Sequence, residues 1–516
     1  MARSRRSGRS WSLRALRVHR LLSISGGLAL LLWGGSGLLH IAMTNFGPQQ
    51  AHFRPPTEHI SLASVRPIHE MLARAQVEQA AAIRIVAGDG ESLLQVTEEQ
   101  DLPRRYFDLE TGLEKLDHDR VHAEFLARHY LGLDTSSEGD DGGTPAGVRS
   151  IEYITEFSDA YPWVNRLLPV YRVEFERPDR LAAYLYTETN ALASVTDIRR
   201  EQIQAVFNAF HTWSWFPRQA EWVRVVVIGC LVGSLLSLSL TGVVLLRTLR
   251  ARAKATRSRR IHRLAAFAFA LPLLMFTTSA LFHLISFADA RPGRSLRLAP
   301  PLDVEKIAYP IHEHWAELTE GLDVSSVSII EDIEGRVLYR VGLARARGSD
   351  PTSAKEIRNA RFDGVPLSGP AVYLDAATGS TVDRGDREIA LGIGSRWIGE
   401  SGARLEGAEL VTRFGPTYDF RNKRLPVWRL DYGEPVFASV FVDTATSGVA
   451  DVLEDSDRPE RFVFAFLHKW NFLFPLGRGL QSTVVATVVG LAIVLLGGTG
   501  FILNRRMRKR AGREAV

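Results

Sequence analysis

Residues 17–40 read RVHRLLSISGGLALLLWGGSGLLH, and residues 260–283 read RIHRLAAFAFALPLLMFTTSALFH. Each stretch opens with a basic segment, continues as an uncharged apolar run and ends on a histidine. At an offset of 243 residues, His19 matches His262 and His40 matches His283. Because similarity at a fixed offset is typical of an internal duplication, we expect two copies of one unit.

The duplication extends beyond these runs. Pro-Ile-His-Glu occurs at 67–70 and again at 310–313, at the same offset. Further along, His-Thr-Trp at 211–213 matches His-Lys-Trp at 468–470 at an offset of 257 residues. Each half therefore consists of an apolar run, a large polar region and a second apolar run.

Four uncharged apolar runs, each of 22 or 23 residues, are long enough to cross a lipid bilayer, because a helix needs roughly 20 residues to do so. The predicted membrane helices are 21–43, 225–246, 264–286 and 481–503. The single cysteine, Cys230, excludes a disulfide scaffold, an iron–sulfur cluster and a cysteine-ligated zinc site.

Basic residues flank these runs unevenly. Residues 1–20, 247–263 and 504–516 together hold 21 Lys and Arg against one acid, whereas the remainder holds 42 basic and 57 acidic residues. Positively charged segments stay in the cytoplasm, so we expect these three inside the cell and the regions 44–224 and 287–480 outside it. The positive charge therefore reports membrane topology, and we expect no nucleic-acid partner.

Each large region reads as two units, in which a helix is followed by strands. Residues 64–77 and 120–131 have helical patterns, and alternating strand-like segments follow each. Asp and Gly at 108–112 and 375–379 suit tight hairpin turns. We therefore predict an α+β membrane protein with four transmembrane helices, arranged as two pseudo-symmetric pairs, and two large α+β domains.

This order of features resembles the PepSY-associated transmembrane family. The features that carry the resemblance are His-Arg before an apolar helix that ends in histidine, strand–Asp-x-x-Thr-Gly turns, and His-x-Trp before the next helix. They cover most of the chain and occur twice. The resemblance implies a bacterial inner-membrane protein with cytoplasmic termini and two PepSY-like units in each periplasmic domain. The family includes haem proteins implicated in reducing ferric siderophores.

Six histidines occupy matched positions in the two halves: His19 and His262 at the inner ends of the first and third helices, His40 and His283 at their outer ends, and His211 and His468 before the second and fourth helices. About 31 Å of helix separates the inner from the outer histidines, roughly one bilayer core. Neutral imidazole is a good axial ligand for haem iron. We therefore expect two or three haem b groups, with the pairing of ligands left open.

Other side chains complete the candidate site. Arg20 and Arg263 follow the inner histidines and could hold haem propionates by charge-assisted hydrogen bonds. Alternatively, the histidines are interfacial anchors and these arginines only follow the topology rule. His69 and His312 begin helices of the outer regions and could bind an iron complex or stabilise the helix start. We interpret His118 and His122, which have no counterpart in the second half, as surface residues.

The function predicted from these features is that of an oxidoreductase of the ferric-siderophore reductase type, which reduces a periplasmic iron complex by haem-dependent electron transfer. The sequence has no G-x-G-x-x-G after a strand and no large cytoplasmic domain. The electron donor is therefore expected to be a quinol or a separate cytoplasmic reductase. The alternatives are a non-enzymatic PepSY binding or regulatory module and a transporter accessory, which the absence of carboxylates in the membrane runs disfavours. The sequence assigns no catalytic residue.

Overall fold

The computed structural model describes residues 2–56, 60, 62, 65–88, 90–133, 146–249, 255–286, 296–315, 324–343, 356, 360, 362–365 and 371–514. The chain divides into two compact units. The helical unit comprises Met1–Gly47, Arg199–Arg291 and Pro459–Val516, and the sheet unit comprises Pro48–Ile198 and Pro292–Arg458. Each unit therefore combines segments from both halves of the chain.

Four helices of the helical unit are long and apolar enough to cross a membrane, as predicted: Ser23–Phe46, Glu221–Thr248, Arg257–Ser286 and Arg478–Lys509. The first contains α2 (Ser23–Ala29), a π-helical turn (Leu30–Gly34) and α3 (Gly35–Phe46). The second and third are α7 (Glu221–Thr248) and α8 (Arg257–Ser286), and the fourth contains α13 (Arg478–Ala492), a π-helical turn (Ile493–Gly498) and the start of α14 (Thr499–Glu514). Helices suit these runs because they satisfy every backbone polar group within the segment.

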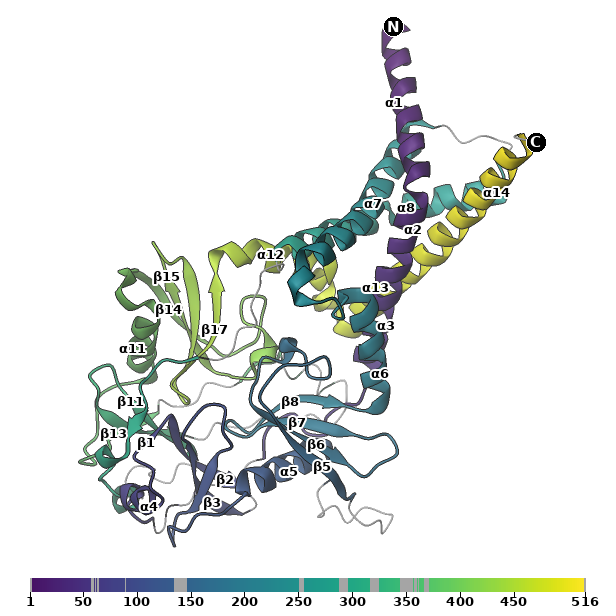
Figure 1. Ribbon diagram of the computed structural model, residues 1–516. Helices are drawn as coiled ribbons and strands as arrows, with labels where there is room; N and C mark the ends of the chain where they lie inside the picture. The colour runs from purple at the N-terminus through teal and green to yellow at the C-terminus, as the bar shows by residue number, and fades with distance from the viewer. Residues whose placement is uncertain are drawn as a thin grey trace. The chain divides into compact units, whose positions relative to one another are not determined.

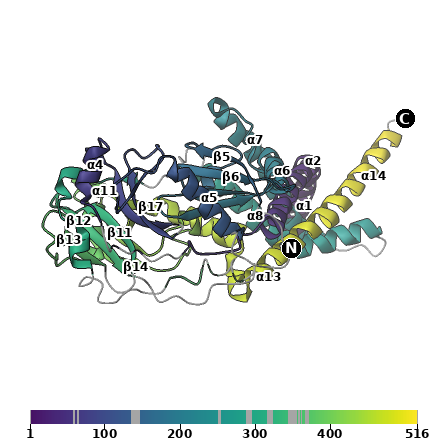
Figure 2. The same ribbon diagram turned by 90° about the horizontal axis from the view of Figure 1, so that it is seen from below.

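These helices pack around a small apolar core. Helix α7 contacts α2, α8 and the N-terminal helix α1 (Ala2–Leu21), and Figures 1 and 2 both show these four elements side by side. Two glycines explain the close approach of the first helix to its neighbours. A Cβ at Gly26 would clash with Leu238 Cδ1, and one at Gly34 would lie 3.1 Å from Ile493 Cδ1. Small residues at such contacts let membrane helices pack closely.

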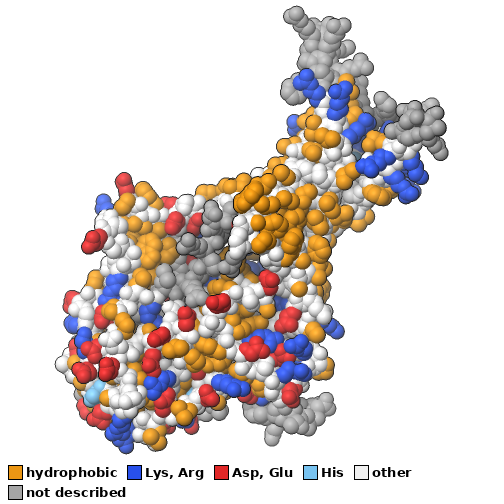
Figure 3. Space-filling view, viewed as in Figure 1, with side chains coloured by type: hydrophobic (Ala, Val, Ile, Leu, Met, Phe, Trp, Pro, Cys, Tyr) orange, Lys and Arg blue, Asp and Glu red, His pale blue; other side chains and the backbone are white. Residues whose placement is uncertain are grey.

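The surface of the helical unit is divided by side-chain type. On the face shown in Figure 3, hydrophobic side chains cover the helices, and Lys and Arg gather at one end of them. Leu264, Phe267 and Leu271 on α8 are 71%, 77% and 68% exposed. Such contiguous apolar exposure suits contact with lipid. The coarse prediction of an α+β protein with four apolar helices is thus confirmed.

The sheet unit is built on a six-stranded antiparallel sheet to which both halves of the chain contribute. Its strand order is β13-β12-β11-β2-β3-β4. The first half supplies β2 (Ala82–Gly88), β3 (Glu91–Thr97) and β4 (Arg105–Asp108), and the second half supplies β11 (Val324–Glu331), β12 (Val337–Leu343) and β13 (Val372–Asp375). The two halves join where β2 pairs with β11, with Arg84 opposite Ser328. Helix α4 (Ile68–Arg74) covers this sheet with buried apolar residues from both halves.

Two further sheets each pack against one helix. A four-stranded sheet contains β5 (Val148–Ile154), β6 (Val170–Phe175), β7 (Ala182–Tyr186) and β8 (Ala191–Thr196), and α5 (His118–Leu131) covers it. A five-stranded sheet contains β14 (Leu405–Val411), β15 (Val427–Tyr432), β16 (Ala438–Asp443), β17 (Gly448–Glu454) and β9 (Leu296–Arg297), and α11 (Asp386–Ile398) covers it. A short ladder pairs β1 (Gln79–Ala80) with β10 (Leu302–Asp303).

The predicted helices and turns of the sheet unit differ from the structure mainly at their ends. The helix predicted over 64–77 is the shorter α4, which follows Pro67 and ends before Gln76, whose φ is +58°. The helix predicted over 120–131 begins two residues earlier. In the predicted hairpin turns, Asp108 and Asp375 each accept hydrogen bonds from the backbone two and three residues ahead. Gly379 has a φ of +74°, and a Cβ there would lie 2.4 Å from the Tyr309 ring.

Candidate functional site

His19 and His262 form a facing pair in the helical unit. His19 lies near the end of α1 and His262 near the start of α8. Their ring centroids are 6.4 Å apart and their planes are at 78°. Two imidazoles that bind one metal through Nε2 would have centroids roughly 6 Å apart, since each metal–nitrogen bond is about 2 Å long. The separation therefore suits two axial ligands of a single iron.

A threonine hydroxyl holds each of these rings. His19 Nδ1 lies 3.0 Å from Thr241 Oγ1, and His262 Nδ1 lies 2.9 Å from Thr499 Oγ1. The Thr241 hydroxyl donates to the Ser237 carbonyl at 2.7 Å, and the Thr499 hydroxyl donates to the Leu495 carbonyl. Because a hydroxyl has one proton to donate, an imidazole donates from Nδ1 when the threonine proton goes to the carbonyl. A neutral ring in this tautomer has its lone pair on Nε2, the atom that would bind a metal.

Serine hydroxyls hold the two histidines before the second and fourth helices. Ser36 Oγ lies 2.9 Å from His211 Nδ1, and Ser279 Oγ lies 3.1 Å from His468 Nδ1. Ser36 donates to the Leu32 carbonyl at 2.5 Å, and Ser279 donates to the Phe276 carbonyl at 3.0 Å. The same hydrogen-bond pattern therefore favours the Nδ1–H tautomer in both rings. In metalloproteins, a hydrogen bond at the second nitrogen orients a ligating histidine.

The outer histidines of the apolar helices lie against phenylalanines. The His40 ring is 4.8 Å from the Phe207 ring, which is 4.6 Å from the His211 ring. In the second half, the rings of His283 and Phe464 are 4.3 Å apart, and those of Phe464 and His468 are 4.8 Å apart. His468 also interacts electrostatically with His211 and His283. These four histidines, His40, His211, His283 and His468, are called the four-histidine cluster below.

Local helix geometry positions this cluster. His211 and His468 lie in the π-helical turns Asn208–Thr212 and Phe464–His468. These turns follow the short helices α6 (Ile198–Phe207) and α12 (Arg458–Val463). Turns of this type are frequent at functional sites because they displace a side chain from the regular helical repeat.

One contact of the cluster belongs to the second half alone. His283 Nδ1 lies 2.5 Å from Glu460 Oε1, and the Glu460 side chain is 6% exposed. At the offset of 257 residues, the first half has Ile203 at this place. The sequence pointed to neither Glu460 nor the hydroxyl partners of the histidines. Thr-Gly at 241–242 and again at 499–500 was the available signal, since a Cβ added at Gly242 or Gly500 would lie 3.8 or 3.7 Å from Cε1 of His19 or His262.

The other predicted site residues have different surroundings. Arg263 donates to the carbonyls of Leu249 and Leu246 at the end of α7, and the Arg20 side chain is exposed. His69 and His312 belong to the sheet unit and not to the unit that contains the other six histidines. His69 Nδ1 lies 3.1 Å from the Ile307 carbonyl, and His312 Nδ1 is buried without a hydrogen-bond partner among the described residues.

The interpretation of His122 as a surface residue is wrong. Its side chain is only 2% exposed, and its Nε2 lies 2.8 Å from Asn190 Oδ1. The sequence does not show this burial, because it depends on how α5 packs. In the structure, the Asn190 amide provides a hydrogen-bond partner for the buried ring. His118 lies beside it, with ring centroids 6.5 Å apart, and is partly exposed.

Among the described residues, no group of three or more His, Cys, Asp or Glu side chains is placed to hold a metal ion by itself. The histidines of the helical unit instead form facing or stacked sets, an arrangement that suits a ligand contacting two of them at a time. No model of a protein family matches this chain, and no curated protein matches its sequence.

Proposed function

We propose that the protein is a haem-dependent electron-transfer protein of the bacterial inner membrane that reduces a ferric-siderophore-type complex in the periplasm. The observation that carries this proposal is a hydrogen-bonding arrangement that four matched histidines share. In His19, His262, His211 and His468, a helix hydroxyl occupies Nδ1 and leaves Nε2 available. A purely structural imidazole at a helix interface has no need of this arrangement four times.

The geometry fits haem b at the His19–His262 pair. His19 and His262, with ring centroids 6.4 Å apart, would hold the iron of one haem between them. Near the first helix, a Cβ at Gly27, Gly35 or Gly37 would meet nothing within 4 Å. The four-histidine cluster supplies ligands for one or two further groups. A haem with two imidazole ligands supplies one-electron redox chemistry without an open coordination position.

The chain's own residues then have three roles. The Thr and Ser hydroxyls fix the tautomer and orientation of the ligands. The apolar helices exclude water and hold the ligands at two depths of the membrane. Arg20 could bind a propionate from its exposed position, whereas Arg263 would have to exchange its carbonyl partners for one.

The orientation follows from charge. The basic segments adjoin the ends of the helices that carry His19 and His262, so we place these ends in the cytoplasm and the sheet unit in the periplasm. The halves would form two pseudo-symmetric helix pairs, each with two PepSY-like units. Reduction of Fe³⁺ to Fe²⁺ consumes one electron, which a quinol or a cytoplasmic reductase must supply. Fe²⁺ is held less firmly by hard oxygen ligands, which frees the metal from its carrier.

The test is an absorbance spectrum of the detergent-purified protein, oxidised and then reduced, with haem quantified per chain. We expect a low-spin spectrum typical of two-histidine ligation that reoxidises when a ferric siderophore is added. Absence of haem after expression with haem supplied would overturn the proposal and leave a membrane-bound binding module. If haem is present but stays reduced with every ferric complex tested, the cofactor assignment would stand and the ferric-siderophore substrate would be rejected.

A further inference from the structure

Four arginines converge inside the sheet unit. Arg84 lies on β2 and Arg104 precedes β4, whereas Arg297 lies on β9 and Arg424 precedes β15. Arg104 and Arg424 are only 3% and 6% exposed. The guanidinium groups of Arg104 and Arg424 lie 5.1 and 5.9 Å from the centre of the Tyr186 ring. The two halves of the chain thus bring four cations to one buried place.

Carboxylates compensate only part of this charge. Glu188, which is 1% exposed, accepts hydrogen bonds from Arg297 at 2.5 Å and from Tyr186 at 2.9 Å. Asp443 Oδ2 lies 3.5 Å from Arg424 Nη1. Asp119 interacts electrostatically with Arg104, but its oxygens accept from the Arg104 backbone and from Tyr106. Glu331 lies near Arg84 and Arg297 but is paired with Arg396 at 3.0 Å. Among the described residues, three other carboxylates therefore face four guanidinium groups, which leaves one positive charge.

Several donors of the cluster are buried without hydrogen-bond partners in the described part of the chain. They are Arg84 Nε, Arg424 Nε and all three side-chain nitrogens of Arg104, of which Nη2 forms a 3.6 Å ion pair with Glu188 Oε2 without a hydrogen bond. Burial lowers the pKa of Arg84, and its attraction to Glu188 and Asp443 does not fully offset this. Unpaired buried donors cost free energy, and guanidinium groups remain charged in proteins. The cluster consequently lacks an acceptor.

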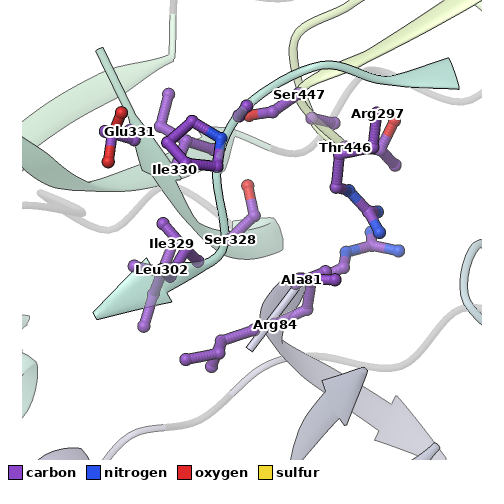
Figure 4. Close-up of a pocket in the computed structure, with 15 residues that line it drawn as sticks. Ala81, Arg84, Arg297, Leu302, Ser328, Ile329, Ile330, Glu331, Thr446 and Ser447 are labelled. Carbon is purple, nitrogen blue, oxygen red and sulfur yellow. The ribbon is translucent and has the colours of Figure 1, made fainter. Parts of the chain in front are cut away.

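Two recesses adjoin three of these arginines, Arg84, Arg297 and Arg424. One, with an empty volume of about 320 Å³ counted out to solvent, is lined by Arg84, Arg297, Ser328 and Ser447 among others. The hydroxyls of Ser328 and Ser447 are also buried without partners among the described residues. Figure 4 shows Arg84 and Arg297 extending into the same space as the Ser328 hydroxyl. The second recess, of about 230 Å³, shares Arg297 with the first and is lined by Arg424 and Glu188.

We propose that this arginine cluster is a binding site for a small carboxylate. A carboxylate carries the one negative charge that is missing, and its two oxygens match the planar fork of a guanidinium group. Both recesses are small and open to solvent, so the site takes a small anion or a single carboxylate arm of a larger molecule. This inference goes beyond electron transfer and does not rest on haem.

The test is isothermal titration calorimetry on the full chain in detergent at constant ionic strength. Acetate, citrate and ferric citrate are the probes, and chloride is the competing anion. Arg84→Met removes an arginine that lines the first recess and has an unpaired donor. Arg105→Met is its matched control because Arg105 is already paired with Glu98 and Glu114. We expect carboxylate binding in the parent chain and in R105M, and at least tenfold weaker binding in R84M.

The three probes distinguish the source of the carboxylate. Binding of acetate or citrate alone identifies a free carboxylate, and binding of ferric citrate alone identifies an arm of an iron chelate. Both outcomes support the site. Failure of all three to bind, or chloride binding as tightly as acetate, would overturn it.

A second variant keeps the test decisive if R84M does not fold. Glu188→Gln removes one of the internal carboxylates and leaves a second positive charge without compensation. We expect roughly tenfold tighter carboxylate binding in E188Q, and unchanged affinity would overturn the assignment. Haem content measured on the same samples should be unaltered in both variants, so failure here is distinguishable from failure of the electron-transfer proposal.

Discussion

His19 and His262, which lie 243 residues apart in the sequence, face each other with ring centroids 6.4 Å apart. The two rings also have matching contacts within their own halves of the chain. His19 contacts Thr241 on α7, and His262 contacts Thr499 on α14. The pair therefore joins four elements of the helical unit.

Removal of either ring should eliminate one haem. In His262→Ala, one imidazole of the facing pair is missing, so we expect haem content to fall by one group per chain while the remaining groups stay low-spin. Haem quantification and electron paramagnetic resonance check this. His52→Ala is the control, since His52 belongs to the sheet unit and pairs with the His129 carbonyl and ring. Equal haem content in H262A and the parent would contradict the assignment.

Loss of a hydroxyl partner should weaken haem binding without abolishing it. Thr241→Val removes the acceptor for His19 Nδ1 and keeps the shape of the side chain. Changes in such supporting hydrogen bonds typically cost about 10–100-fold in metal-site affinity or activity, and we expect haem affinity to fall within that range. Thr248→Val on the same helix is the matched control, because its hydroxyl bonds only to the Val244 carbonyl. Haem titration of the apoprotein measures both.

Glu460 should make the two halves electrochemically unequal. A carboxylate 2.5 Å from His283 Nδ1 favours the oxidised, more positive form of any iron that His283 binds. Glu460→Gln should therefore raise the reduction potential of that group by on the order of 60 mV, the equivalent of a tenfold change for one electron. Spectroelectrochemical titration resolves the components. Asp455→Asn, an exposed change in the same stretch, should leave every potential unaltered.

Stability should depend on pH through Asp419 in the sheet unit. Burial raises the pKa of Asp419, but hydrogen bonds from the Arg421 guanidinium and backbone outweigh it and lower the pKa from 3.8 to about 2. Because the folded pKa is depressed, the stabilisation is present above pH 4 and is lost as the pH falls from about 4 to 2. It amounts to at most about 2 kcal/mol, at roughly 1.4 kcal/mol per pKa unit.

Denaturant unfolding between pH 5 and 2.5, followed by tryptophan fluorescence, checks this dependence. Asp419→Asn should flatten the acid limb of the stability curve, whereas Asp455→Asn should not. Identical slopes for D419N and the parent would show that another group governs the acid limb.

Two buried tyrosines should act as matched structural anchors. The Tyr161 hydroxyl donates to the Leu167 carbonyl at 2.8 Å, and the Tyr418 hydroxyl donates to the Arg424 carbonyl at 3.1 Å. Tyr161→Phe and Tyr418→Phe should each reduce the free energy of unfolding by about 1 kcal/mol, because a buried acceptor loses its partner. Tyr153→Phe is the control, since its buried hydroxyl has no partner among the described residues. A loss in Y153F as large as in Y161F would refute the hydrogen-bond argument.

The sequence by itself determined the local features. The four apolar helices follow from runs of 22 or 23 uncharged residues, since length and hydropathy decide whether a helix can enter a bilayer. The hairpin turns at Asp108 and Asp375 follow from side chains that bond their own backbone. The matched histidines were visible because a constant offset survives in the primary sequence.

Only the tertiary structure decided which of these features meet. Nothing in the strand patterns indicated that β2 pairs with β11 across the two halves, because an alternating pattern fixes the buried face of a strand and not its neighbour. The hydroxyl partners of the histidines, the carboxylate of Glu460 beside His283 and the burial of His122 depend equally on contacts between distant segments. The four arginines lie up to 340 residues apart in the sequence, and their shared charge exists only where folding removes them together from water.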